Sequence, residues 1–215
     1  LGRALANTPK EKIILSHGWS GRGTHLFKIA DELLKAGYST ISFDAPAHGK
    51  SPGNTTLMSE FVATILEIEK QFGPFEAAVG HSLGGMSLLN ATKKGLSINR
   101  LAIIGSGDII QDILDDFVAK MELKPSTSTQ LRLHFEKKLG VEMDSYSAYK
   151  SAMEVSIPVL VIHDKNDSEV PVTAAIHIHK HLKNGELFLT EGLGHRKILG
   201  NSEVIEKVVR FINRL

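Results

Sequence analysis

Gly80-His81-Ser82-Leu83-Gly84 is a G-x-S-x-G pentapeptide that joins an expected strand, residues 75–79, to an expected helix, residues 85–91. A serine on so sharp a turn is pushed out of the chain with its Oγ exposed. The turn leaves no room for side chains at the flanking positions, so both are glycine. Such a hydroxyl becomes a nucleophile when a base reaches it. The plain alternative is a turn that needs its glycines for packing alone.

The composition of the 215 residues fits one folded domain, 1–215, with a sizeable core. Hydrophobic residues make up 42% and charged residues 23%, as in ordinary soluble globular proteins. The formal net charge is +1 and no basic stripe stands out, which disfavours a nucleic-acid partner. No apolar run approaches the ~20 residues of a membrane span, and no signal peptide is visible. The lack of cysteine fits a cytoplasmic protein.

Short apolar runs alternate with longer helical patterns along the chain. The runs are brief and end at turn residues, as strands buried on both faces do. The expected strands are 12–17, 39–43, 75–79, 100–105, 158–163 and 186–190. Apolar residues recur at helical spacing over 57–72 and over 204–212, the latter behind Asn201 as N-cap, and Gly37 and Gly73 stand where helices should stop. This alternation predicts an α/β fold with a mostly parallel sheet of about six strands and helices on both faces.

One interval, about 108–156, holds no convincing strand. Its apolar spacing predicts a helix over 109–121 and two more over 131–139 and 146–153. The sequence Pro-Ser-Thr-Ser-Thr at 125–129 predicts a loop between helices. An insertion of this size between two strands is expected to form a helical cap. The alternative is a helical excursion that does not contact a substrate.

A nucleophilic serine needs a base, and the base needs an acid that orients it. His195 lies in a glycine-flanked loop after the last expected strand, and Asp167 follows the strand before it. Both are therefore expected at the carboxyl edge of the sheet, together with Ser82. The order Ser82, Asp167, His195 is that of the nucleophile-elbow architecture. We prefer Asp167 for its spacing to the Val-Pro that follows, while Asp164, which could instead cap that loop, and Asp108 remain alternatives.

Acyl transfer also needs two hydrogen-bond donors for the developing oxyanion. The backbone N–H of Leu83, at the start of the elbow helix, is expected to supply one. The N–H of Trp19, in the sequence His-Gly-Trp after the first strand, is expected to supply the other. The Trp19 side chain would then wall the acyl pocket or simply pack. His81 and Phe117 are further candidates for contact with the substrate.

The chain resembles the α/β-hydrolase superfamily over nearly its whole length. The resemblance rests on five motifs in the family's order: His17-Gly18-Trp19, the stretch 44–51 (DAPAHGKS), the stretch 80–85 (GHSLGG), the Asp167 loop, and Gly194-His195. It implies Ser82 as nucleophile, His195 as general base and then acid, and Asp167 as the orienting carboxylate. It also implies the Trp19 and Leu83 amides as the oxyanion hole.

Two departures from the family pattern stand out. Ala47 replaces the first glycine of D-x-x-G-x-G-x-S, a change that a structural turn should tolerate. Members usually have two strands before the one that ends in His-Gly, whereas about a dozen residues precede it here. We therefore expect either a shortened chain or a sheet that lacks its antiparallel edge.

Together these features predict a serine hydrolase without cofactor or metal that cleaves a small or medium carboxylic ester, a small-molecule substrate, through an acyl-enzyme. The elbow does not separate ester cleavage from thioester or amide cleavage, acyl transfer, or hydrolysis of a carbon–carbon bond. A non-catalytic binding or signalling protein of the same fold is the alternative from another class. His177, His179 and His181 alternate along a helix, where a solvated face is expected rather than a metal site, because no third ligand is apparent.

Overall fold

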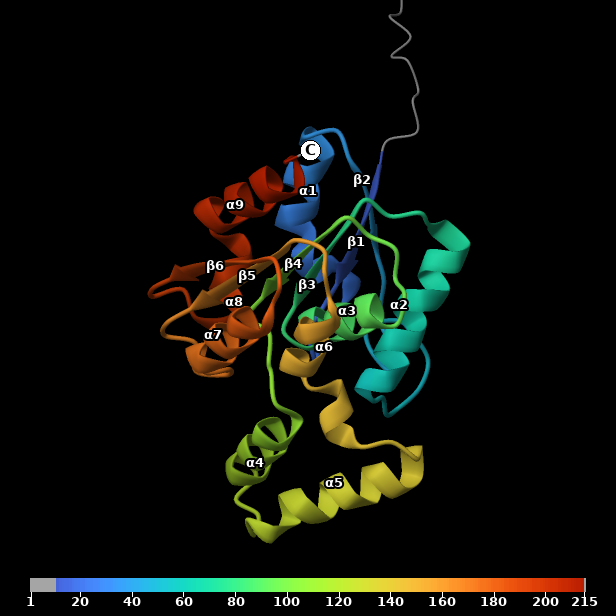
Figure 1. The fold of residues 1–215 in the computed structure, drawn as a ribbon, viewed down its shortest axis with the longest axis vertical. Coiled ribbons are helices and arrows are strands. Elements are labelled where there is room, and N and C mark those ends of the chain that lie inside the picture. Colours follow the sequence, from blue (N-terminus) through green and yellow to red (C-terminus); the bar gives the residue numbers. More distant parts are fainter. Residues whose placement is uncertain (1–10, 215) are drawn as a thin grey trace, which may run out of the picture.

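A six-stranded sheet forms the centre of the molecule (Figure 1). The computed structural model describes residues 11–214. Within them all neighbouring strands run parallel, in the order β2-β1-β3-β4-β5-β6. The strands are β1 (Lys12–Ser16), β2 (Ser39–Ser42), β3 (Ala77–His81), β4 (Arg100–Ile104), β5 (Val159–Asp164) and β6 (Gly185–Thr190). The predicted sheet is confirmed. The segment before β1, which bears on the expected loss of an antiparallel edge, lies outside the described residues.

Helices cover both faces of this sheet. The face with α1 and α9 buries Ile13 and Leu15 of β1, whereas Ile14 between them belongs to the core under α2, α3, α6 and α7. Successive side chains of a strand point to opposite faces, so an all-apolar strand fills two cores at once. These helices are α1 (Phe27–Lys35), α9 (Ser202–Ile212), α2 (Met58–Phe72), α3 (Leu83–Lys93), α6 (Ala148–Glu154) and α7 (Val172–His181).

The predicted helix ends are confirmed. Asn201 caps α9, since its Oδ1 accepts a hydrogen bond of 3.1 Å from the Val204 N–H. Helix α1 ends just before Gly37, which takes a φ of 102°, and α2 ends at Gly73. No helix among residues 11–214 combines the length and the hydrophobicity needed to cross a membrane.

The interval 108–156 is helical, as expected, but its elements differ in detail. Helices α4 (Ile110–Lys120) and α5 (Ser126–Leu139) stand away from the sheet, and the 3-10 helix η2 (Met143–Tyr146) leads back to α6 (Figure 1). The predicted loop at 125–129 is wrong, because α5 begins directly behind Pro125. The proline ring fixes a φ of −53°, which suits a helix start, and the Ser128 Oγ donates to the Pro125 oxygen. That these helices act as a cap stays a prediction.

The carboxyl edge of the sheet gathers the loops that carry the candidate site. His17 follows β1 directly, Ser82 follows β3 directly, and Asp164 is the last residue of β5. Strand β6 leads into the loop before His195. The remaining short helices also lie in these loops: η1 (Gly23–Leu26), α8 (Gly194–Lys197) and η3 (Ile198–Gly200). Parallel strands bring all these ends to the same edge, so residues far apart in the sequence meet there.

Candidate active site

Ser82 lies at a sharp turn between β3 and α3. Its φ of 53° and ψ of −122° are values that residues other than glycine rarely adopt. The Ser82 N–H continues the sheet by donating to the Ile104 oxygen at 2.9 Å. A Cβ on Gly80 would lie 2.7 Å from the carbonyl of Gly84, and one on Gly84 would lie 2.3 Å from the Ser16 oxygen. Both glycines are therefore required by close backbone contact, which holds the serine in its strained conformation.

His195 and Asp167 form a close pair at the same edge. The His195 Nδ1 lies 2.7 Å from Asp167 Oδ2, while Oδ1 of this carboxylate accepts hydrogen bonds from the Glu169 and Val170 amides at 2.8 and 2.9 Å. Burial acts to raise the pKa of Asp167, but the hydrogen bonds from His195 and the two amides outweigh it and hold the pKa below its usual value. The carboxylate is thus an acceptor, which places the imidazole proton on Nδ1 and leaves the Nε2 lone pair free.

The other two candidate acids are engaged elsewhere. Asp164 is fully buried and accepts hydrogen bonds from the Asn166 amide, the Thr190 hydroxyl and the Leu193 amide. Burial alone would raise the pKa of Asp164, but these bonds and one from the Gly194 amide lower it to about 2. It holds the loops after β5 and β6 together, which is the capping role considered above.

Asp108 pairs with a different histidine. Its Oδ2 lies 2.5 Å from His177 Nδ1, and its Oδ1 accepts from the Tyr149 N–H at 2.8 Å. Burial raises the pKa of this carboxyl despite these bonds. Neither Asp108 nor Asp164 contacts the His195 ring through a hydrogen bond, so the geometry associates His195 with Asp167.

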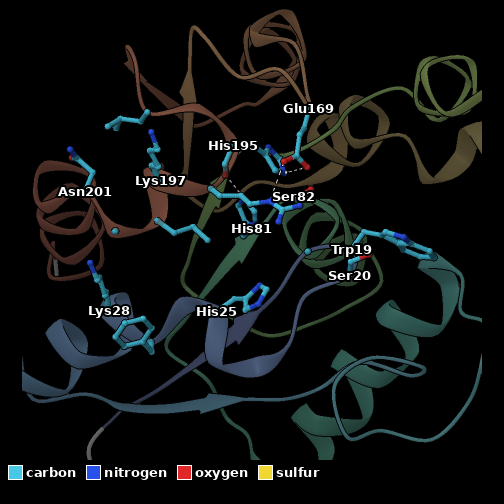
Figure 2. Close-up of a pocket in the computed structure, with 16 residues that line it drawn as sticks. Trp19, Ser20, His25, Lys28, His81, Ser82, Glu169, His195, Lys197 and Asn201 are labelled. Atoms are coloured by element: carbon cyan, nitrogen blue, oxygen red, sulfur yellow. Dashed lines mark hydrogen bonds and ion pairs between the residues drawn. The ribbon is translucent and has the colours of Figure 1, made fainter. Parts of the chain in front are cut away.

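Ser82 and His195 line the same cavity, of about 750 Å³ (Figure 2). Within residues 11–214 no hydrogen bond joins the Ser82 hydroxyl to the imidazole, a contact that in many enzymes tightens only when substrate binds. Glu169 also lines this cavity: its Oε2 is 4.0 Å from His195 Nε2, and its Oε1 accepts from Arg196 Nε at 3.1 Å. Sequence reasoning missed Glu169, although its place two residues after Asp167 was a signal that it would lie near the imidazole.

His81 supports the His195 loop from beneath. Its Nε2–H donates to the backbone oxygen of His195 at 2.9 Å, and the two rings lie 4.6 Å apart. Burial, followed by charge repulsion from His195, lowers the pKa of His81 to about 3, so the ring is a neutral donor. The ring also borders the cavity. Its predicted contact with substrate stays a prediction.

A buried histidine organises the loop that carries Trp19. The His17 Nε2 accepts from the Ala45 N–H at 3.0 Å, so its proton resides on Nδ1, which donates to the Gly18 oxygen at 2.8 Å. Burial lowers the pKa of His17 and keeps the ring neutral. A Cβ on Gly18 would lie 2.8 Å from the Ser82 Cβ, so only glycine permits this approach. In the described part of the chain, the Trp19 and Leu83 amides donate to no other residue.

The stretch 44–51 forms a second supporting loop. The Asp44 carboxylate accepts from the Gly23 and Lys50 amides at 2.7 and 2.8 Å, and these bonds lower its pKa. Ala47, which stands where the family pattern has glycine, takes a φ of 59°. The backbone conformation is thus retained at the cost of a strained alanine. His48 Nε2 accepts from the Ser20 N–H, which ties this loop to the Trp19 loop.

A second cavity, of about 550 Å³, adjoins the first at Ser82. Trp19, Ser82 and Glu169 line both cavities. Apolar side chains form most of its remaining wall: Leu83, Met86, Ile109, Ile113, Val170, Pro171 and Ala174. Phe117 does not line either cavity within residues 11–214 and is half exposed on α4. The structure therefore does not bring Phe117 to the site.

The three alternating histidines of α7 are held by separate partners. His177 pairs with Asp108, His179 Nε2 lies 3.2 Å from the Gly185 oxygen, and His181 Nδ1 lies 2.8 Å from the His177 oxygen. Across residues 11–214 there is no group of three or more side chains arranged to hold a metal ion.

Comparison with known proteins agrees with this architecture. A sequence model described as the alpha/beta hydrolase family matches residues 13–207. The chain therefore belongs to the α/β-hydrolase family. No curated protein matches it.

Several solved structures share the fold at low sequence identity. The Est1E structure from Butyrivibrio proteoclasticus, with ferulic acid bound, superposes with a TM-score of 0.72 at 20% identity, covering 97% of this chain and 93% of that one. Mouse alpha/beta hydrolase domain-containing protein 10 superposes with a TM-score of 0.70 at 19% identity, covering 96% of this chain and 88% of that one. The meta-cleavage product hydrolase from Pseudomonas fluorescens superposes with a TM-score of 0.69 at 18% identity, covering 94% of this chain and 90% of that one. At such identities the likeness concerns the fold alone.

Proposed function

We propose that this protein is a serine hydrolase that cleaves a small or medium carboxylic ester through an acyl-enzyme, with Ser82 as nucleophile, His195 as base and Asp167 as orienting acid. The observation that carries the proposal is the 2.7 Å pair of His195 and Asp167 on a cavity wall that Ser82 shares. A strained serine, an oriented imidazole and a buried carboxylate at one sheet edge are the parts that acyl transfer requires.

The proposed reaction has two steps. Ser82 Oγ forms a bond to the ester carbonyl carbon while its proton passes to His195 Nε2. The carbon–oxygen bond to the alcohol then breaks, and His195 returns the proton to the departing oxygen. In the second step a water gives a proton to His195 Nε2 as its oxygen bonds to the acyl carbon. The bond from this carbon to Ser82 Oγ then breaks, and His195 returns the proton to Oγ, which releases the acid and restores the Ser82 hydroxyl. The free Trp19 and Leu83 amides support their assignment as donors to the oxyanion.

Chemical labelling tests the proposed nucleophile. A fluorophosphonate probe should label the protein at Ser82, and Ser82→Ala should abolish both the labelling and the hydrolysis of p-nitrophenyl butyrate. Ser20→Ala is the matched control, because Ser20 lines the same cavity without a proposed role. The control should keep its labelling. Full hydrolysis by the Ser82→Ala protein would refute the assignment.

Other acyl chemistry at the same residues is separated by substrate. The relative kcat/KM of the wild-type protein for esters, thioesters and amides distinguishes these kinds of cleavage. An alcohol acceptor added to the ester assay distinguishes acyl transfer from hydrolysis. A folded wild-type protein that the probe does not label would instead favour a binding protein without catalysis.

A further inference from the structure

The two cavities that meet at Ser82 differ in charge. The larger cavity is lined by His25, Lys28, Arg196 and Lys197, with Glu169 as its acidic residue. The smaller cavity is lined by four acidic residues, Asp108, Asp112, Asp116 and Glu169, and none of its described lining residues is lysine or arginine. Three of these acids are paired: Asp108 with His177, Asp116 with Lys120 and Glu169 with Arg196. A substrate bound across Ser82 thus meets lysine side chains on one side only.

The position of His195 indicates which cavity holds the alcohol portion of the substrate and which holds the acyl portion. During acylation His195 must hand its proton to the oxygen of the departing alcohol, so the alcohol must lie on the imidazole's side of the serine. His195 lines the larger cavity and does not line the smaller one. The alcohol portion therefore occupies the larger, positive cavity, and the acyl portion occupies the smaller cavity with its apolar wall.

Two lysines supply the positive charge at the far end of the larger cavity. Lys28 comes from α1 and Lys197 from α8, and Figure 2 shows them with Asn201 at the end opposite Trp19. The Lys28 ammonium lies against the η3 turn, since a Cβ on Gly200 would be 3.2 Å from its Nζ.

No acidic side chain among residues 11–214 neutralises either ammonium. Lys28 and Lys197 form no ion pair with any residue in the range 11–214, whereas Arg196 pairs with Glu169. Their charges are therefore available to a ligand in the cavity.

From this arrangement we infer that the preferred substrate is an ester with an apolar acyl group whose alcohol portion carries an anionic group, a carboxylate or a phosphate, held by Lys28 and Lys197. The inference rests on the proposed function. The smaller cavity favours the same orientation, because its described lining offers an anion no lysine or arginine.

Matched pairs of esters test the preference. Butyrate esters of 4-hydroxybenzoate and of 3-(4-hydroxyphenyl)propanoate carry an anion at two distances from the scissile bond, and their methyl esters are the neutral counterparts. In the Lys28→Gln/Lys197→Gln protein, kcat/KM for the better carboxylate substrate should fall about tenfold, because each lysine contributes about threefold. The kcat/KM for the corresponding methyl ester should change less than about twofold. High salt should weaken the wild-type preference by screening.

Lys180→Gln is the matched control, because Lys180 is an exposed lysine without an ion pair in the described part of the chain and lines neither cavity. This variant should keep the wild-type ratio of carboxylate to methyl ester. If the double variant also keeps that ratio for both lengths, the inference is wrong, although Ser82-dependent hydrolysis would still support the proposed function.

A binding measurement separates the two proposals if turnover is absent. Calorimetry with the Ser82→Ala protein should show tighter binding of the carboxylate ester than of its methyl ester, and the two lysine substitutions should remove the difference. Equal binding of both esters would overturn the anion site whatever the enzyme does. Preferential binding without Ser82-dependent hydrolysis in the wild type would support the anion site and refute the hydrolase.

Discussion

Two aspartates have buried carboxylates, Asp164 at the end of β5 and Asp167 in the loop that follows. Substituting asparagine should impair stability at Asp164 and activity at Asp167. In Asp167→Asn, the side-chain oxygen must stay where Oδ1 is, because the Glu169 and Val170 amides both donate there. The new NH₂ group then faces His195 Nδ1, which lies 2.7 Å from the Asp167 carboxylate in the wild-type protein. The imidazole must accept at Nδ1 and carry its proton on Nε2, the tautomer that cannot deprotonate Ser82.

The magnitude follows from that tautomer. We expect kcat to fall by about 10³–10⁴, equivalent to about 4–5.5 kcal/mol of barrier at 1.36 kcal/mol per tenfold. The free energy of unfolding should fall by less than about 1 kcal/mol, because every backbone donor keeps its acceptor.

In Asp164→Asn the cost is to stability. Oδ1 accepts from the Asn166 amide and Oδ2 from the Leu193 amide and the Thr190 hydroxyl, so either orientation of an amide turns its NH₂ toward a backbone N–H. We expect a loss of about 2–3 kcal/mol in the free energy of unfolding, because a buried donor loses its acceptor. The fraction that remains folded should keep kcat within about tenfold of wild type.

Urea denaturation and kcat on p-nitrophenyl butyrate, measured on both variants, decide the matter. The expected result is an inactive but stable Asp167→Asn protein and an active but destabilised Asp164→Asn protein. If Asp164→Asn instead remained stable and lost more activity than Asp167→Asn, the acid would be misassigned and the tautomer argument would fail.

Three further predictions concern stability. Ala47→Gly should raise the free energy of unfolding by about 0.5–1 kcal/mol, because relief of a φ of 59° outweighs the greater freedom of glycine in the unfolded chain; an unchanged urea midpoint would contradict this. Gly84→Ala should cost about 3 kcal/mol or more, since its Cβ would lie 2.3 Å from the Ser16 oxygen, and a wild-type melting temperature would show that the turn can relax. The pKa of Asp164 is lowered to about 2, so the ionised carboxylate stabilises the fold fully above its unfolded pKa of about 3.9, and this stabilisation is lost as the pH falls toward 2. Between these pH values the free energy of unfolding, measured by urea denaturation, should fall less in Asp164→Asn than in the wild-type protein.

The sequence was informative where a short segment has few alternatives. A G-x-S-x-G turn between a strand and a helix, brief apolar runs, and helix ends at Gly37 and Gly73 are local patterns whose physical causes lie within a few residues. It was misleading at 125–129, where polar residues typical of a loop also suit the first turn of a helix behind a proline.

The site itself divides in the same way. The order of Ser82, Asp167 and His195 along the chain was enough to nominate them, because the carboxyl ends of parallel strands meet at one edge. The choice of Asp167 over Asp164 rested on spacing alone, and only the hydrogen-bond partners of each carboxylate distinguish their roles. Phe117 was nominated from its place in the inserted helices, but the direction in which those helices project depends on tertiary packing.

What the sequence determined by itself is the parallel sheet, the strained elbow and the identity of the groups that could react, since each follows from local sterics and strand order. What only the tertiary structure decided is which of those groups face one another, where Glu169 stands, and that Lys28 and Lys197 line only one of the two cavities beside Ser82. The physical reason is that a side chain's partners and its electrostatic surroundings are set by residues distant in the sequence, which no local pattern records.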